Sequence, residues 1–270
     1  LKNKNFLFVD GRYTIQAKIQ SGKNFKIVDY TKLYNVNLFK NLNLGIDPTL
    51  ITSLQIKNFF LKNNKIKLIE KNLVDNIFNS KKKSSKPFYS LDKKITGESH
   101  LKKIDKIGKF LKDNRCDYLL ITAPENIAWL LNIRGYDNPN SPIPNAHLLI
   151  NKKKDIFLIV DKKKSINLLR EKKLKKNQII QPQHITNFLY KLNKGKIILD
   201  IKTCSIHIEK ILIKRFKIIK KEDPIYLLKS IKNKQEIKNM IDAHILDGVA
   251  LTKFLYWIKK INKGKINEFD

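Results

Sequence analysis

Several features that would identify a chemical activity directly are missing from this sequence. The nine glycines never form a GxG triplet, which excludes a dinucleotide-binding fingerprint and a phosphate-binding P-loop. A GxSxG segment is also absent, so the sequence has no nucleophile elbow of the hydrolase type. No apolar run approaches the ~20 residues that a membrane-spanning helix requires, and we expect no membrane association.

Cysteine and histidine are too few and too scattered to indicate a metal centre. Cys116 and Cys204 form no CxxC pair, and we expect reduced thiols of a cytoplasmic protein. Cys204 and His207 lie close in sequence, but a zinc site needs about four ligands. The acidic residues show no local pairing typical of acid–base catalysis. The histidines form no HExxH or HxH motif and are expected to be structural or surface residues: His100, His147, His184, His207 and His244.

Arginine is scarce, although the chain is strongly basic. The 56 basic residues comprise 51 lysines and five arginines, and the formal net charge is +32. Readers of bases and phosphates favour arginine for its bidentate geometry. The lysines are spread along the whole chain together with many asparagines and isoleucines, all encoded by A/T-rich codons. We therefore expect a solvated lysine surface with no specific nucleic-acid partner, and polyanion binding only as a side effect at low salt.

The segment Asp117–Ile150 indicates a mixed α/β core. Asp117–Thr122 is an apolar run too short for a helix and is typical of a buried strand. Proline followed by an acidic residue suits a helix start, which predicts a helix over Glu125–Asn132 with Trp129 as a large anchor. A proline-rich loop then leads to a second strand, Ala146–Ile150.

Strand and helix patterns alternate along the rest of the chain, which has 270 residues and a length typical of about two domains. Asp47 and Pro48 indicate a helix start at N-cap and N1. The expected strands are Phe6–Val9, Phe25–Tyr30, Asn43–Ile46, Lys65–Glu70, Ile156–Val160, Gln178–Gln181, Lys196–Asp200 and Phe216–Lys220. The expected helices are Tyr13–Gln20, Thr49–Leu61, Ser99–Asn114, Lys163–Lys173, Gln183–Leu192, Ser205–Lys214, and a short and a long helix within Tyr226–Lys260.

Several segments resemble, in order, segments of the Xaa-Pro aminopeptidase family. ITAPENIAWLLNIRGYDNPNSPIP (Ile121–Pro144) is similar to the family's LTALDxIAWLLNLRGxDxPxxPV, and FVDGRYTIQAKIQ (Phe8–Gln20) to DGRYxLQAxxQ. LGIDPTLIT, KNLVDNIF and ITGES are similar to VGVDPxLI, xNLVDxIW and YAGES. The helices within Tyr226–Lys260 resemble KxxKNxxExxxMRxAHxxDGxAxxxFLxWL, which opens the family's catalytic pita-bread domain.

The resemblance implies an α/β fold of two creatinase N-terminal-type domains, each a mixed sheet flanked by helices, followed by the first helices of a truncated pita-bread domain. The implied bounds are 1–80 for the first domain, with its start missing, and 81–92 for a linker. The second domain would span 93–222, and the opening of the catalytic domain 223–270. His244 belongs to the last motif, where we expect it to pack or hydrogen-bond.

The resemblance also implies a chemistry. Family members hydrolyse the N-terminal Xaa-Pro bond of peptides with two divalent metal ions, usually manganese, held by two Asp, one His and two Glu. These ligands would follow this chain, so no catalytic or metal residue is expected within it, and the chain alone should be inactive. Arg12 corresponds to the arginine that contacts the peptide substrate. Without the resemblance, Arg12 would be interpreted as an ordinary surface arginine. The implied partners are peptides with proline second and an identical subunit in a homodimer.

A second hypothesis is a non-catalytic pita-bread-related module that binds an acidic partner through its basic surface. A third is a lysine-rich nucleic-acid binder. The residues downstream would separate the first two, and a salt titration would test the third.

Overall fold

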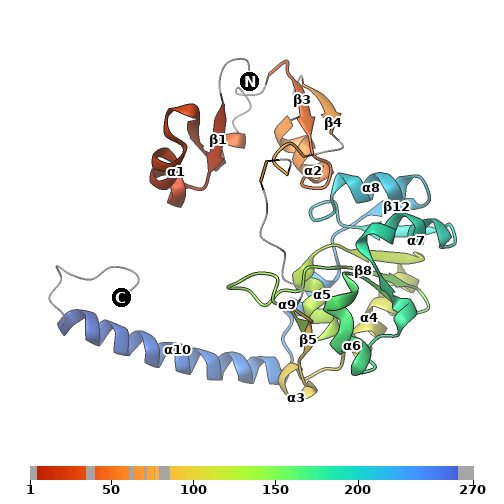
Figure 1. Ribbon diagram of the computed structural model, residues 1–270. Helices are drawn as coiled ribbons and strands as arrows, with labels where there is room; N and C mark the ends of the chain where they lie inside the picture. The colour runs from red at the N-terminus through yellow and green to blue at the C-terminus, as the bar shows by residue number, and fades with distance from the viewer. Residues whose placement is uncertain are drawn as a thin grey trace. The chain divides into compact units, whose positions relative to one another are not determined.

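The computed structural model describes residues 5–34, 40–60, 64–69, 72–75, 77–78 and 86–260. The chain forms two compact units, each assembled from separated stretches. The first unit comprises Leu1–Lys83, Cys116–Ala123 and Gln183–Glu222, and the second comprises Ser84–Arg115, Pro124–Pro182 and Asp223–Asp270. Helices and strands alternate in both (Figure 1), so the predicted mixed α/β class is confirmed.

Two parallel strand pairs lie in the first unit. Strand β1 (Phe6–Val9) pairs with β2 (Lys26–Asp29), and helix α1 (Thr14–Ser21) connects them. Strand β3 (Asn43–Ile46) pairs in the same way with β4 (Lys65–Leu68). Each pair with its connecting helical segment is a strand–helix–strand unit, the arrangement expected when strands and helices alternate. All four strands were predicted from their short apolar runs, and their positions are confirmed.

The first unit also contains three parallel strands in the order β6-β11-β12. Ile198 in the middle strand pairs with Leu119 on one side and with Ile219 on the other. Residues of β6 and β11 are almost entirely buried, as expected for parallel strands covered on both faces. The strands are β6 (Tyr118–Ile121), β11 (Lys196–Leu199) and β12 (Lys217–Lys220), and the accompanying helices are α7 (Ile185–Lys191) and α8 (Ile206–Ile213).

The predicted cap at Asp47 is wrong. Helix α2 (Ser53–Gln55) begins after Thr52, whose hydroxyl accepts from the Gln55 amide, while the Gln55 side chain accepts from the Thr52 amide. Asp47 Oδ1 instead accepts hydrogen bonds from the Thr49 amide at 2.8 Å and from the Thr49 hydroxyl at 2.7 Å. This local turn competes with helix formation, because short acidic side chains can satisfy nearby backbone amides outside a helix. A segment of π-helix, η5 (Ile56–Phe60), follows α2.

The second unit contains an antiparallel hairpin formed by two of the predicted strands. Strand β8 (His147–Asn151) is antiparallel to β9 (Ile156–Ile159), and β10 (Ile179–Ile180) is parallel to β9. Asn151 Oδ1 accepts hydrogen bonds from the backbone amides of Lys153 and Asp155, and these bonds fix the turn between β8 and β9. A second, short antiparallel pair joins β5 (Tyr89–Ser90) to β7 (Ile133–Arg134).

Helix α4 (His100–Asp113) has the clearest amphipathic pattern, and Ser99, which was expected to be its first residue, caps its first turn. Ile104, Ile107 and Leu111 are at most 4% exposed, and the helix packs on α5 (Pro124–Leu131) and on β8. The remaining helices of this unit are α3 (Lys93–Thr96), α6 (Ile166–Arg170), α9 (Ile225–Ser230) and α10 (Lys234–Lys260).

Helix α10, the predicted long helix, has an apolar stripe, but none of its residues is buried. Ile241, Ile245 and Leu255 are 55%, 59% and 48% exposed. His244 is exposed as well, so the expectation that it packs against a neighbour is wrong for the described structure. Among the described helices, none combines the length and the apolar character needed to cross a bilayer.

The core of the second unit gives a direct test of the packing. Leu130 on α5 is fully buried, and Leu130→Ala should lower the free energy of unfolding by about 2–5 kcal/mol, because it leaves a cavity. The matched variant Leu227→Ala, at a position that is 68% exposed, should change it by no more than about 0.5 kcal/mol. Urea unfolding of both variants measures the difference, and equal losses would contradict the described packing.

Candidate functional site

Arg12, the predicted substrate-binding residue, lies on a turn directly after β1. Its Nε donates to Asp10 Oδ1 at 2.9 Å and its Nη2 donates to Oδ2 at 3.3 Å, and the Arg12 side chain is 78% exposed. The hydrogen bond to Asp10 raises the pKa of Arg12 and lowers that of the carboxyl. The pair holds the guanidinium in one orientation at the surface. Its role in binding peptide stays a prediction.

No group of three His, Cys, Asp or Glu side chains that could hold a metal ion occurs among the described residues. These residues therefore do not fit a metal centre. Cys116 and Cys204 are buried and are not joined by a disulfide, and burial raises the pKa of the Cys204 thiol to about 12. Such a thiol stays protonated and is a poor nucleophile near neutral pH.

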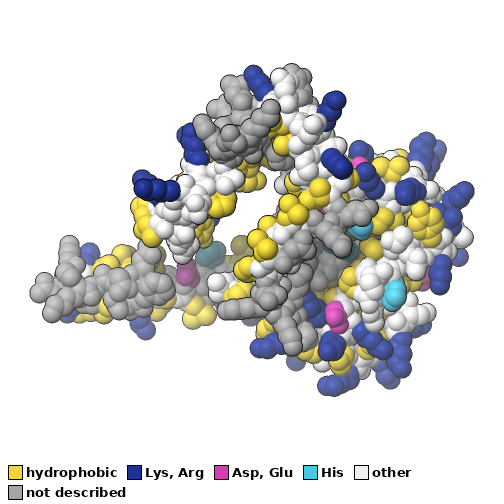
Figure 2. Space-filling model, turned by 45° about the horizontal axis from the view of Figure 1, so that its top comes forward, with side chains coloured by type: hydrophobic (Ala, Val, Ile, Leu, Met, Phe, Trp, Pro, Cys, Tyr) yellow, Lys and Arg dark blue, Asp and Glu magenta, His cyan; other side chains and the backbone are white. Residues whose placement is uncertain are grey.

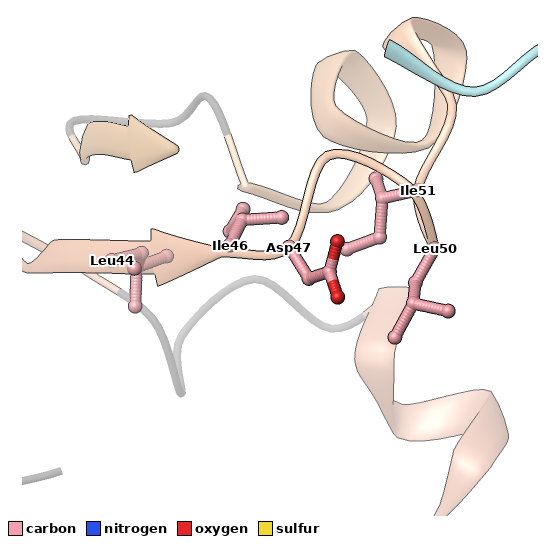
Figure 3. A pocket seen from close by; sticks show the side chains of 6 residues that line it. Leu44, Ile46, Asp47, Leu50 and Ile51 are labelled. Atoms are coloured by element: carbon pink, nitrogen blue, oxygen red, sulfur yellow. The ribbon is translucent and has the colours of Figure 1, made fainter. Parts of the chain in front are cut away.

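A small apolar pocket of about 240 Å³ lies beside the LGIDPTLIT motif in the first unit (Figure 3). Asp47 is its single charged lining residue. Asp47 Oδ2 accepts a hydrogen bond from Asn72 at 2.9 Å, and Oδ1 accepts the hydrogen bond from the Thr49 amide that forms the local turn. The carboxylate is thus used to hold the loop. The lining residues are Leu44, Gly45, Ile46, Asp47, Leu50 and Ile51.

A larger pocket of about 370 Å³ lies within the second unit and is much more polar in character. We call it the cationic pocket, because four basic side chains and one carboxylate line it. It combines residues of α3, α4, α5, α10 and the segments between them. The lining residues are Leu91, Ile95, Thr96, Lys103, Trp129, Asn132, Arg134, Lys229, Lys232, Glu236, Asn239 and Met240.

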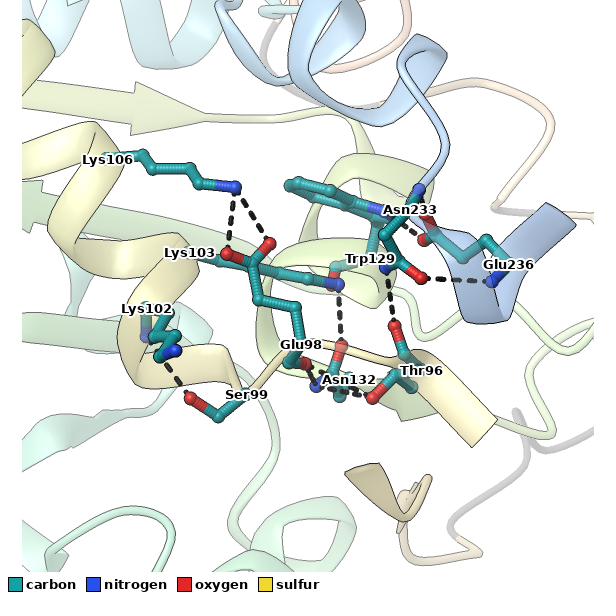
Figure 4. A network of polar contacts seen from close by, with 10 residues as sticks. All are labelled: Thr96, Glu98, Ser99, Lys102, Lys103, Lys106, Trp129, Asn132, Asn233 and Glu236. Carbon is teal, nitrogen blue, oxygen red and sulfur yellow. Dashed lines mark hydrogen bonds and ion pairs between the residues drawn. The ribbon is translucent and has the colours of Figure 1, made fainter. Parts of the chain in front are cut away.

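Lys103 is the most deeply buried of these charges, with 1% of its surface exposed. Its Nζ donates to the Trp129 carbonyl oxygen at 2.9 Å and to Asn132 Oδ1 at 2.8 Å, and lies 3.9 Å from the centre of the Trp129 ring (Figure 4). Burial lowers the Lys103 pKa to about 8, an effect that nearby carboxylates oppose and that Arg134 adds to. The ring face and two neutral oxygens thus hold this cation.

Asn132 connects Lys103 to the start of α4. It follows α5 with a left-handed φ of 51°, a conformation that asparagine tolerates better than most residues. Its Nδ2 donates to Thr96 Oγ1 at 3.1 Å and to the Glu98 carbonyl oxygen at 2.8 Å (Figure 4). One amide side chain therefore joins the end of α5 to α3 and to the cap of α4.

The first turns of α10 are attached to the same network. The Asn233 amide donates to Glu236 Oε2 at 2.9 Å and the Glu236 amide donates to Asn233 Oδ1 at 3.0 Å, a reciprocal arrangement like a capping box. Trp129 Nε1 donates to Glu236 Oε1 at 3.1 Å (Figure 4). Asn233 and Asn239 donate to the carbonyls of Thr96 and Ile95. These bonds fix the start of α10 against α3 and α5.

Sequence reasoning did not find the cationic pocket. Trp129 was expected as an anchor, and it is half-buried with its indole N–H bonded to Glu236. Lys103, Lys229 and Lys232 are three of 51 lysines, and Figure 2 shows Lys and Arg side chains scattered over its visible face. Nothing in their spacing separates these three from the others. The one available signal is Lys103 on the apolar face of α4.

The pKa of Lys103 predicts a specific pH dependence of stability. The ordinary value is 10.5 and the folded value about 8, so between these limits the unfolded chain binds more protons than the folded one. The free energy of unfolding of the wild type, relative to Lys103→Met, should therefore rise as pH increases from about 8 to about 10.5.

Urea unfolding at about pH 7.5 and about pH 10 measures this difference, because the linear extrapolation gives the free energy at each pH. Lys102→Met, an exposed position on the same helix, reports the effect of losing one positive charge in general. A difference between wild type and Lys103→Met that stays constant with pH would contradict the burial of this amine.

Comparisons with known proteins identify the family. The model of the Creatinase/Prolidase N-terminal domain matches residues 79–236. The chain is 28% identical over 286 residues to a probable Xaa-Pro aminopeptidase P of Laccaria bicolor, covering 98% of this chain and 44% of that protein. It is 30% identical over 283 residues to Xaa-Pro aminopeptidase 1 of Dictyostelium discoideum, covering 96% and 44%.

The fold agrees with these matches. The crystal structure of X-prolyl aminopeptidase from Caenorhabditis elegans, described as a cytosolic enzyme with a di-nuclear active site, superposes with a TM-score of 0.74. The sequences are 24% identical, and the match covers 96% of this chain and 45% of that one. This chain thus spans less than half the length of these relatives. It belongs to the Creatinase/Prolidase N-terminal domain family and resembles the Xaa-Pro aminopeptidases, as its motifs predicted.

Proposed function

We propose that this chain is the substrate-restricting portion of an Xaa-Pro aminopeptidase, a hydrolase that cleaves the bond between an N-terminal residue and a following proline. The observation that carries the proposal is the breadth of the match. Relatives with this name align over 96–98% of the chain. The alignment therefore includes both units and helix α10, in addition to the family-model segment.

The proposed domain order follows the motifs. Residues 1–80 form the first creatinase-type domain, 93–222 form the second, and 223–270 open the catalytic pita-bread domain. The linker at 81–92 lies partly outside the described residues. The apolar side chains along α10 support the third assignment, because a helix stripe of this kind is normally buried against a neighbouring element.

In this proposal, this chain binds and orients the peptide substrate. In the complete enzyme two divalent ions, manganese in our proposal, would polarise the scissile carbonyl and supply a nucleophile near neutral pH. The described residues offer no group that could hold such ions, so their ligands would come from beyond them. Arg12 would donate to a peptide oxygen, since its guanidinium is exposed and its orientation is held by Asp10.

We also propose a cytoplasmic location and a homodimer of the complete enzyme. The location is supported by the description of the Caenorhabditis elegans relative as cytosolic. The two cysteines are not joined by a disulfide, which suits a reducing compartment. The dimer rests on the family resemblance alone.

A second candidate function is a non-catalytic module that binds an acidic partner. The net charge of +32 favours this alternative, because a basic surface attracts polyanions at low ionic strength. The same charge would favour nucleic acid, but binding of that kind should weaken steeply as salt rises.

The proposal is tested with the protein encoded by the whole gene. That protein, loaded with manganese, should cleave a peptide with proline in the second position and leave the matched peptide with alanine there largely intact. The readout is release of the first amino acid. Equal cleavage of both peptides, or cleavage of neither by a folded and metal-loaded protein, would contradict the proposal.

Arg12→Ala in the same protein should lower kcat/KM for the proline peptide by roughly 10- to 100-fold, the value of one charge-assisted hydrogen bond. Because Arg12 is exposed, the free energy of unfolding should change by no more than about 0.5 kcal/mol. Lys18→Ala, an exposed cation on α1, is the matched control. If Arg12→Ala leaves kcat/KM unchanged, Arg12 does not bind the substrate and is an ordinary surface arginine.

A further inference from the structure

The cationic pocket has an excess of positive charge that the protein itself does not neutralise. Lys103, Arg134, Lys229 and Lys232 line it, and Glu236 is its single carboxylate. Among the described residues, no carboxylate forms an ion pair with any of the four cations, although ion pairs occur elsewhere, such as Lys106 with Glu98 at 2.8 Å. Within the part of the chain that the structure describes, the four cations of the pocket are therefore left without a carboxylate at ion-pair distance.

Each cation is held by neutral oxygen atoms. Arg134 Nη1 donates to the Ile133 carbonyl oxygen at 2.9 Å, and Lys229 Nζ donates to Asn126 Oδ1 at 2.6 Å. Lys232 Nζ donates to the carbonyl oxygens of Lys229 and Ser230. A lysine ammonium has three N–H donors and a guanidinium has five, so these bonds leave donors for a ligand.

Both carboxylate oxygens of Glu236 already accept hydrogen bonds from the protein. Oε1 accepts from the Trp129 indole and Oε2 accepts from the Asn233 amide, which leaves Glu236 committed to the start of α10. Burial lowers the pKa of Lys103 and of Arg134, and at Lys103 the effect of burial exceeds the opposing effect of Glu236 and Glu98. An anion in the pocket would supply further negative charge beside these cations.

The uncharged part of the lining combines apolar residues with Thr96, Asn132 and Asn239. Leu91, Ile95 and Met240 contribute aliphatic surface, and Trp129 contributes its ring. The volume of about 370 Å³ falls in the range of pockets that enclose small organic ligands. Aromatic and aliphatic walls with a few convergent polar groups are the composition typical of such sites, whereas a site for inorganic phosphate alone needs no apolar wall.

We infer that the cationic pocket is a binding site for a small organic carboxylate that carries an aromatic or aliphatic group. The carboxylate accepts from Arg134, Lys229 and Lys232, and the apolar group lies against Trp129, Ile95 and Met240. This site lies entirely within the second unit, uses neither Arg12 nor any metal, and does not depend on the proposed peptidase activity. Because Glu236 and Asn239 also hold α10, a ligand here should stabilise the attachment of that helix.

The probe is 3-phenylpropionate, with 3-phenylpropionamide as the uncharged match and inorganic phosphate as the anion without an apolar group. Titration of the chain, followed by Trp fluorescence and by isothermal calorimetry, should show saturable binding of 3-phenylpropionate. The amide and phosphate should each bind at least about tenfold more weakly, because the amide lacks the negative charge and phosphate lacks the apolar group.

Two variants locate the binding site. Lys232→Met, at an exposed position, and Arg134→Met should each weaken binding of 3-phenylpropionate by about tenfold or more, the value of a charge-assisted hydrogen bond. Lys238→Met removes an exposed cation from α10 outside the pocket and should leave binding unchanged. Circular dichroism verifies that each variant is folded, and the exposed Lys232 position keeps the test valid if Arg134→Met does not fold.

Three results would overturn the inference. They are no saturable binding of 3-phenylpropionate, equal binding of the amide or of phosphate, and an equal loss of affinity in Lys238→Met and Lys232→Met. The last result would mean that the probe responds to the general charge of the chain.

Discussion

A buried cation without a carboxylate partner is the constraint around which the second unit is arranged. Removing an ammonium from water is costly, and Lys103 is tolerated only because fixed neutral groups surround it. The Trp129 carbonyl oxygen and Asn132 Oδ1 accept hydrogen bonds from its ammonium group, and the Trp129 ring lies beside it. These groups must stay in place, so α3, α4 and α5 are held in one arrangement. The electrostatic requirement of one side chain thereby fixes the geometry of three helices.

The same network decides how α10 begins. Glu236 bonds to Trp129, and Asn233 bonds to Thr96, so the helix starts at a defined point on the second unit. Beyond its first turns the helix presents apolar side chains to solvent. A helix anchored at one end and apolar along its length is suited to carry a further packed structure. This agrees with the proposed opening of a catalytic domain, in which the second unit would set the direction of approach.

Patterns of local chemistry made much of the fold predictable. The strand Asn43–Ile46 was expected at the residues where it occurs. A short apolar run acts within a few residues, so a sequence reveals it directly. The cap at Asp47 was mistaken because an acidic residue before a proline suits both a helix start and a local turn. Tertiary contacts decide between them: the Pro48 carbonyl accepts from the His207 amide, far along the chain.

The two candidate sites also differ in how far the sequence could predict them. Arg12 was singled out by a family motif, and its surface position agrees with a binding role without testing it. The sequence did not reveal the cationic pocket, because its residues come from separate segments and three of its four cations are lysines in a lysine-rich chain. Only the fold brings Lys103, Arg134 and Lys232 to one cavity. His244 shows the opposite error, since a family motif suggested packing that the described structure does not contain.

The central functional claim is that this chain serves a metallopeptidase whose metal ligands lie outside the described residues. Elemental analysis of the protein encoded by the whole gene, after loading with manganese and removal of free metal, tests it most directly. The account predicts about two tightly bound ions per chain, in line with the di-nuclear active site of the Caenorhabditis elegans relative. A folded protein that retains no metal after this treatment would contradict the account and favour a non-catalytic binding module.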